Sequence, residues 1–202
     1  MLFPKILETL HQASLLPIDT ARLPVLSEVE SYISKKLEQG LPVNLNFICT
    51  HNSRRSQLSQ VWAEVIAYHL ALPVKAFSGG VEVTACNNRT ISSLLRAGFE
   101  IGEASGDNPK YGVRYATDQA PITVFSKLYD DQGNPIKDFA AIMTCSEADE
   151  NCPYIPGAES RIPLRYEDPK KYDDTENESQ AYDQRSLQIA AELYHILSHC
   201  KS

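Results

Sequence analysis

The sequence predicts an α/β domain with a mainly parallel sheet, preceded by a helical extension. Three observations lead to this fold class. From residue 43 onward, short apolar segments alternate with segments that have the apolar spacing of helices. The first 40 residues show helical spacing only. The length of 202 residues suits a single compact domain with a substantial core.

Residues 1–40 predict two helices, because their apolar residues recur at helical intervals. The first pattern comprises Phe3, Ile6, Leu7 and Leu10, and the second comprises Val25, Leu26, Val29, Ile33 and Leu37. Pro24 precedes the second pattern and Gly40 follows it, as expected at the two ends of a helix. We expect both helices to pack on the main body and cover one face of its sheet. A partner-binding segment is the alternative.

The main body, residues 41–202, supplies the strands and helices of the predicted sandwich. Strands are expected at 43–48, 74–77, 122–129, 139–144 and 161–164. Helices are expected at 56–70, around 91–97 and in a closing segment through 187–197. Residues 167–182 are strongly polar, and we expect only their start to be fixed by the chemistry of the site.

Composition excludes several functions. The 19 Lys and Arg residues against 26 Asp and Glu residues give a net charge of −7, which argues against general nucleic-acid binding. No apolar run approaches the roughly 20 residues of a membrane span, and the N-terminus does not have the pattern of a signal peptide. We therefore expect a cytoplasmic protein with no membrane partner.

The cysteines number five, and their odd count favours functional thiols in a reducing cytosol over a disulfide framework. They are Cys49, Cys86, Cys145, Cys152 and Cys200. There is no CxxC pair, so we do not expect a structural metal site. Cys86 and Cys200 lie in no motif and are interpreted as incidental.

The most informative segment runs from Cys49 to Ser56, between a predicted strand and a predicted helix. A loop that leads into a helix N-terminus directs its backbone N–H groups at one point, which creates an oxyanion cradle. The same field stabilises a thiolate, so Cys49 is expected to be a nucleophile. Arg55 can return across the loop to grip two oxygens of an oxyanion, and Ser56 can donate a hydrogen bond to the Cys49 sulfur. The expected oxyanion-binding residues are Thr50, His51, Asn52, Ser53, Arg54, Arg55 and Ser56.

This Cys-x5-Arg-Ser pattern resembles the phosphate-binding loop of low-molecular-weight protein tyrosine phosphatases and of the arsenate reductases that share their fold. The resemblance implies a three-layer sandwich with a central four-stranded sheet, and it makes residues 41–202 the catalytic domain. Two positions depart from the common wording. His51 stands where glycine is usual, and Arg54 stands where the reductases usually have cysteine.

The resemblance also implies a general acid on a late Asp-Pro loop, which Asp168 and Pro169 match. Transfer to Cys49 requires a proton for the departing oxygen. Proline favours an extended conformation for the preceding aspartate, which suits a side chain that projects into a pocket. We therefore assign the acid to Asp168. The alternative is that Asp168 is an ordinary turn residue.

Cys145 and Cys152 distinguish the two branches of the family, because thioredoxin-coupled arsenate reductases carry a Cys-x6-Cys pair followed by proline. The resemblance implies that Cys49 takes up arsenate, Cys145 attacks Cys49, and Cys152 then attacks Cys145 to leave a disulfide that thioredoxin reduces. Ser146 resembles a helix start. A helix over 146–152 would separate the two Cα atoms by roughly 10 Å, whereas a disulfide needs them within about 7 Å. Oxidation must therefore unwind this polar segment, which we expect to have little packing to lose.

Three hypotheses follow. The leading one is a thioredoxin-coupled arsenate reductase that uses Cys49, Cys145 and Cys152. The second is a protein tyrosine phosphatase that forms a phosphocysteine at Cys49, with Arg55 and Asp168. The third is a non-enzymatic module that senses oxyanions or redox state.

Asn52 and Ser78 match positions that support the loop, and in some reductases also a potassium ion. Gln60 replaces an acidic residue common near that ion site. We therefore expect loop support from Asn52 and Ser78 rather than a potassium site.

Overall fold

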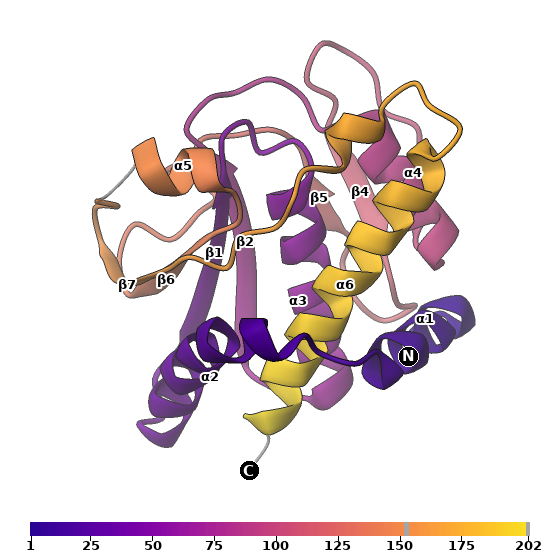
Figure 1. Cartoon of the computed structure of the whole chain (residues 1–202). Coiled ribbons are helices and arrows are strands. Elements are labelled where there is room, and N and C mark those ends of the chain that lie inside the picture. Colours follow the sequence, from indigo (N-terminus) through magenta and orange to yellow (C-terminus); the bar gives the residue numbers. More distant parts are fainter. Residues whose placement is uncertain (152–153, 201–202) are drawn as a thin grey trace.

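A parallel four-stranded sheet forms the centre of the molecule (Figure 1). The computed structural model describes residues 1–151 and 154–200. The strands lie in the order β2-β1-β6-β7, with bounds Val74–Gly80, Val43–Cys49, Phe139–Met143 and Ala158–Ile162. All three neighbouring pairs are parallel. This arrangement confirms the predicted fold class and places the carboxyl ends of β1, β2 and β6 at one edge.

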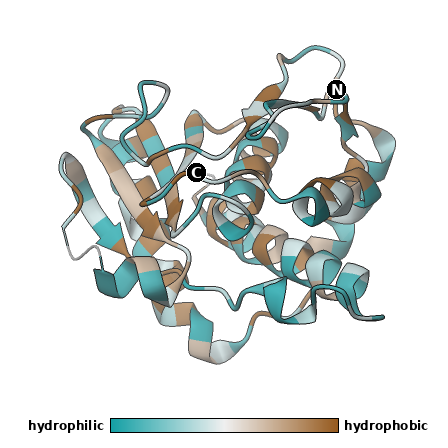
Figure 2. Ribbon diagram, turned by 90° about the horizontal axis from the view of Figure 1, so that it is seen from above, coloured by the Kyte–Doolittle hydropathy of each residue, from teal (hydrophilic) through white to brown (hydrophobic). Residues whose placement is uncertain are grey.

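Helices flank the sheet, and alternate residues of its strands face opposite layers. Leu45 and Phe47 of β1 join the larger hydrophobic cluster, with α3 (Arg55–Leu70) and α6 (Glu178–His199). Ile48 joins a smaller cluster on the other face, with α5 (Ser146–Asn151). α4 (Asn88–Ala97) packs beside α6. Figure 2 shows the apolar strands and inner helix faces in the interior, and hydrophilic residues on the outside.

The two predicted N-terminal helices are present as α1 (Pro4–Leu15) and α2 (Leu23–Glu38), separated by a short 3-10 helix at Thr20–Arg22. α2 packs on α6, β7 and β1, whereas α1 packs on α6 and α4. Their fully buried residues belong to the same cluster as the sheet. The two helices thus complete the main core, and the division at residue 40 stays a prediction.

A second sheet was not predicted. It is antiparallel, with β3 (Glu100–Ile101), β4 (Tyr111–Arg114) and β5 (Ile122–Val124). The single strand expected over 122–129 is therefore wrong beyond Val124. Residues 126–129 leave this sheet and run beside the end of β2, because Gly80 bonds to the backbone of Lys127 and Tyr129.

The remaining boundaries differ for local reasons. β7 ends at Ile162 rather than at residue 164, and Pro163, which has no N–H to donate to a ladder, follows it. The polar segment 167–182 contains a 3-10 helix at Pro169–Tyr172 and the first turn of α6. Among the residues that the structure describes, no helix has both the length and the apolar character needed to cross a membrane.

Truncation of Leu10 tests whether α1 belongs to the core. The Leu10 side chain is 2% exposed, and that of Leu15 on the same helix is 70% exposed. Leu10→Ala is expected to lower the free energy of unfolding by roughly 2–5 kcal/mol, because it leaves a cavity. Leu15→Ala is expected to change it by less than about 0.5 kcal/mol. Denaturant unfolding measures both values, and equal small effects would show that α1 is an independent appendage.

Candidate active site

Cys49 ends β1 and is 4% exposed, at the base of a small cavity. Its sulfur lies 3.0 Å from the hydroxyl oxygen of Ser56, in the first turn of α3. The Asn52 amide donates to the same hydroxyl at 2.9 Å. Ser56 can therefore direct its own hydrogen at the Cys49 sulfur, which is then the hydrogen-bond acceptor.

The loop between Cys49 and α3 turns its carbonyl groups outward, to the surrounding scaffold. Thr50 O accepts from Val81 N and Glu82 N, both at 2.9 Å. His51 O accepts from the Ser126 hydroxyl at 2.8 Å, and Ser53 O accepts from Asn87 N at 3.0 Å. In a planar trans peptide the N–H points opposite to the C=O. The N–H groups that follow these carbonyls are thereby directed away from the scaffold contacts, as an oxyanion cradle requires.

Asn52 fixes the sharpest point of the loop. Its φ is +47°, a left-handed conformation that asparagine tolerates better than most residues. The side chain is fully buried; besides its bond to Ser56, Oδ1 accepts from Lys127 N at 3.1 Å. The Gln57 amide donates to Asn52 O at 2.9 Å. These hydrogen bonds hold Asn52 in its left-handed backbone conformation, which costs about 1–3 kcal/mol when nothing stabilises it.

Ser78, in β2, extends the same support. Its hydroxyl donates to Gln60 Oε1 at 2.6 Å and lies 3.4 Å from Gln57 Oε1. Asn52 Oδ1 and Ser78 Oγ are thus engaged in hydrogen bonds, and the neighbouring Gln60 carries no charge. These contacts form a hydrogen-bonded support for the loop.

Arg55 reaches the predicted acid loop. Its Nη2 donates to Asp168 Oδ2 at 2.7 Å and its Nη1 donates to Tyr166 O at 2.9 Å. Its Nε–H is buried and has no hydrogen-bond partner in the described part of the chain. Asp168 Oδ1 accepts from Lys170 N at 3.0 Å and so caps the 3-10 helix. The guanidinium and the carboxyl group therefore meet at the mouth of the cavity.

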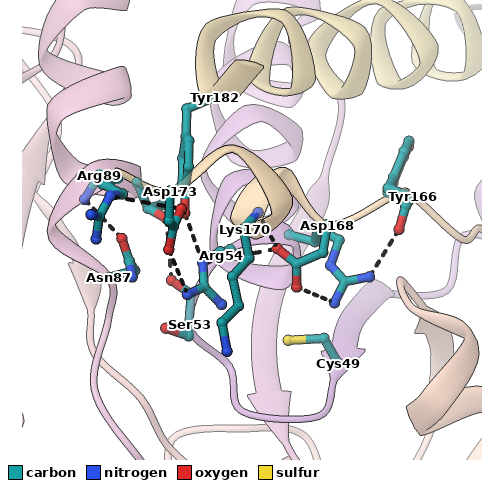
Figure 3. A network of polar contacts seen from close by, with 12 residues as sticks. Cys49, Ser53, Arg54, Asn87, Arg89, Tyr166, Asp168, Lys170, Asp173 and Tyr182 are labelled. Carbon is teal, nitrogen blue, oxygen red and sulfur yellow. Dashed lines mark hydrogen bonds and ion pairs between the residues drawn. The ribbon is translucent and has the colours of Figure 1, made fainter. Parts of the chain in front are cut away.

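Arg54 takes part in a network that joins the loop to the segment from Asp168 to Tyr182 (Figure 3). Its Nε donates to the Tyr182 hydroxyl at 2.9 Å, and its Nη2 lies 3.7 Å from Asp173 Oδ2. The Tyr182 hydroxyl donates to Asp173 Oδ1 at 2.8 Å, and burial with this bond raises the Tyr182 pKa. Arg89 of α4 also pairs with Asp173, at 3.7 Å. Arg54 thus anchors the segment that follows Asp168.

The cavity has a volume of about 140 Å³ and a polar, charged lining. The lining residues are Cys49, Thr50, His51, Ser53, Arg54, Arg55, Glu147, Asp168 and Lys170. Lys170 and Glu147 were missed by the sequence analysis, although each lies two residues from a predicted site residue. Tyr182 and Asp173 were missed as well, and no local motif marks them.

Cys145 lies beside this cavity, at the start of α5, and is 1% exposed. Its sulfur accepts from Ala148 N at 3.3 Å and lies 3.5 Å from the Thr50 hydroxyl oxygen. That hydroxyl donates to Glu147 at 3.0 Å. A second hollow, of about 570 Å³, is lined by Cys145 and shares Arg55, Glu147 and Asp168 with the first. The fold thus brings Cys145 to the residue that follows Cys49, whereas Cys152 lies outside the described residues.

α5 is more firmly held than its composition suggested, which corrects one expectation. Asp149 is buried and forms an ion pair with Arg161 at 2.5 Å. The same carboxylate accepts from Arg165 Nε at 2.5 Å, and Ala148 is fully buried. Unwinding of this segment therefore has to break a buried pair of charge contacts.

The other two cysteines differ from this pair. Burial raises the pKa of the Cys86 thiol to about 12, and burial also raises the pKa of Cys200. Both thiols are therefore poor nucleophiles at neutral pH.

The chain is similar in sequence to arsenate reductases. No protein-family model matches the chain. Over 124 residues the chain is 31% identical to an arsenate reductase of Staphylococcus aureus, covering 61% of this chain and 76% of the relative. It is 27% identical to an arsenate reductase of Bacillus licheniformis over 139 residues, covering 69% and 83% respectively.

Solved structures show the fold. A low-molecular-weight phosphotyrosine phosphatase of Vibrio cholerae gives a TM-score of 0.53 at 13% identity, covering 77% of this chain and 94% of that chain. A low-molecular-weight protein tyrosine phosphatase of T. tengcongensis gives 0.52 at 13% identity, covering 77% and 98%.

Gly80 tests the contact between β2 and the loop. A Cβ at this position would lie 2.8 Å from Asn52 N, Thr50 O and Glu82 O. Gly80→Ala is expected to cost about 1–3 kcal/mol of stability and to weaken binding of inorganic phosphate, because the loop must shift. Gly102→Ala meets no atom within 4 Å and serves as the control. Thermal unfolding and phosphate titration give both effects; wild-type phosphate affinity in Gly80→Ala would contradict the described loop packing.

Asp149 tests how α5 protects Cys145. Asp149→Asn removes the charge that Arg161 and Arg165 contact, so local opening is expected to become easier. Alkylation of Cys145 by iodoacetamide should accelerate about tenfold, equivalent to about 1.4 kcal/mol. Glu150→Gln, on the exposed side of the same helix, is the matched control. An unchanged rate in Asp149→Asn would mean that the ion pairs do not restrain the helix.

Proposed function

The chain belongs to the family that unites low-molecular-weight protein tyrosine phosphatases with the arsenate reductases of the same fold, and we propose that it is an arsenate reductase. The observation that carries this proposal is the position of Cys145. A phosphatase needs one thiol, whereas Cys145 is a second thiol in contact with Thr50, next to the nucleophile. The family consists of enzymes, so the sensing-module hypothesis is set aside.

The lining of the cavity supports an inorganic oxyanion as the substrate. No Phe, Tyr or Trp occurs among its nine lining residues, which all belong to the described part of the chain. A phosphotyrosine ring needs an apolar or aromatic wall to bury its surface. Arsenate needs only hydrogen-bond donors and positive charge, which Arg55, Lys170 and the loop N–H groups supply.

Arg55 and Asp168 support the first chemical step. The buried Nε–H of Arg55 is a donor without a partner among the described residues, and it suits an arsenate oxygen. Arsenate also competes with Asp168 for the guanidinium. The Cys49 thiolate attacks arsenic, one As–O bond breaks, and Asp168 gives its proton to the departing oxygen, which leaves as water.

The remaining steps move two electrons from thiols to arsenic. The Cys145 thiolate attacks the Cys49 sulfur, the S–As bond breaks, and its electron pair reduces As(V) to As(III), which leaves as arsenite. A Cys49–Cys145 disulfide remains. Cys152 then attacks the Cys145 sulfur and releases the Cys49 thiolate, and thioredoxin reduces the Cys145–Cys152 disulfide by thiol exchange. A reducing cytoplasm suits this cycle.

A protein tyrosine phosphatase is the second candidate, because Cys49, Arg55 and Asp168 also form the complete set for phosphocysteine chemistry. In that case Cys145 and Cys152 would protect Cys49 by reversible disulfide formation. The two candidates share one cradle, since arsenate and phosphate agree in shape and charge.

Arsenite formation in the presence of thioredoxin, thioredoxin reductase and NADPH tests the proposal. The native chain is expected to turn over repeatedly, and Cys145→Ser is expected to form no arsenite because the S–As bond has no attacking thiol. Cys152→Ser should stop after a single turnover, and Cys200→Ser should match the native chain. No arsenite from the native chain, with Cys49-dependent hydrolysis of p-nitrophenyl phosphate, would identify a phosphatase instead.

A further inference from the structure

Two histidines and a glutamate meet on the surface where α2 contacts the last turns of α6. His195 and His199 are four residues apart on α6 and therefore lie on the same helix face. Glu30 approaches them from α2, and the three side chains place their ligand atoms within 4.8 Å of one another. Figure 1 shows this end of α6 beside α2, away from α5. The cluster is thus separate from the Cys49 site.

The backbone that carries the cluster is fixed by packing. Val29 and Ile33, which flank Glu30 on α2, are fully buried, and so is Ile196 on α6. The Cys200 thiol lies 3.7 Å from Glu30 O, and the Ser34 hydroxyl donates to the Cys200 sulfur at 3.5 Å. The backbone that presents the three side chains is therefore held in place.

The ring of His199 is oriented as metal-binding histidines are. Its Nδ1 lies 2.6 Å from His195 O, and because a carbonyl oxygen can only accept, this nitrogen carries the hydrogen. In the neutral ring the lone pair is then on Nε2, the atom that would coordinate an ion. Histidine ligands of metals commonly donate their other N–H to a backbone carbonyl in this way. The two rings lie 4.3 Å apart between centroids, tilted by 53°.

We propose that Glu30, His195 and His199 bind a divalent first-row transition ion, with Zn²⁺ the best fit. Two imidazole nitrogens and one carboxylate oxygen form a donor set that Zn²⁺ prefers, and water completes the coordination. The ion would cross-link α2 to α6 and so stabilise the attachment of the N-terminal helices. This site is independent of the proposed reductase chemistry.

A titration with Zn²⁺ followed by NMR of the histidine rings tests the site in the full chain. The five histidines include His51, which lies beside Cys49 and reports on metal bound by the catalytic thiols. One equivalent of Zn²⁺ is expected to shift the ring signals of His195 and His199, while those of His11 and His69 remain unchanged. A shift of His51 alone, or unsaturable changes at all five rings, would overturn the proposal.

Variants then distinguish a three-ligand site from nonspecific binding of Zn²⁺ to single histidines. His199→Ala and Glu30→Gln are each expected to weaken Zn²⁺ binding by at least about tenfold. His11→Ala, which removes an exposed histidine of α1, should bind as the native chain does. Zn²⁺ should raise the Tm of the native chain and of His11→Ala, but not of His199→Ala at the same concentration. Unchanged affinity in both ligand variants would contradict the site.

Discussion

The hydrogen bond between the Ser56 hydroxyl and the Cys49 sulfur is the interaction on which the rest of the site depends. It closes a loop that begins at the last residue of β1 and ends in the first turn of α3. To form it, the chain must reverse direction within a few residues, and Asn52 must adopt a left-handed conformation. The buried contacts of Asn52 with Ser56, Gln57 and Lys127 offset that cost.

Charge contacts extend this arrangement to segments distant in sequence. Arg55 binds the loop that carries Asp168, and Arg54 binds Tyr182 at the start of α6. On the other side, Thr50 reaches Cys145, where α5 begins. The proposed oxyanion cradle, Asp168 and Cys145 are therefore positioned by neighbouring residues of one loop. A shift of the loop is expected to disturb all three at once.

Much of the fold was predictable, because the buried strands and amphipathic helices have clear periodic patterns. The position of the Cys49 loop followed from the strand before it and the helix after it. The second sheet was not predictable, since β3 and β5 have only two and three residues and no clear alternation. Residues 126–129 follow the apolar run 122–125 and were included in the predicted strand, yet Lys127 and Tyr129 bond to Gly80 instead.

In the site, too, some residues could be predicted from the sequence and others could not. Cys49, Arg55 and Asp168 belong to motifs, so the sequence alone pointed to them. Tyr182 and Asp173 act on the site through Arg54, and such long-range contacts leave no local pattern. The polar sequence of α5 suggested weak packing, but charge pairing with Arg161 and Arg165 is a tertiary property that composition does not reveal.

The most direct test of this account is the rate at which iodoacetamide alkylates Cys49 at mildly acidic pH. We expect Cys49 to react faster than Cys200, whose thiol pKa is raised by burial, and we expect phosphate or arsenate to protect Cys49. Ser56→Ala should slow the reaction, whereas Ser59→Ala, one turn further along α3, should not. Equal rates for Cys49 and Cys200, with no protection by phosphate, would contradict the oxyanion cradle.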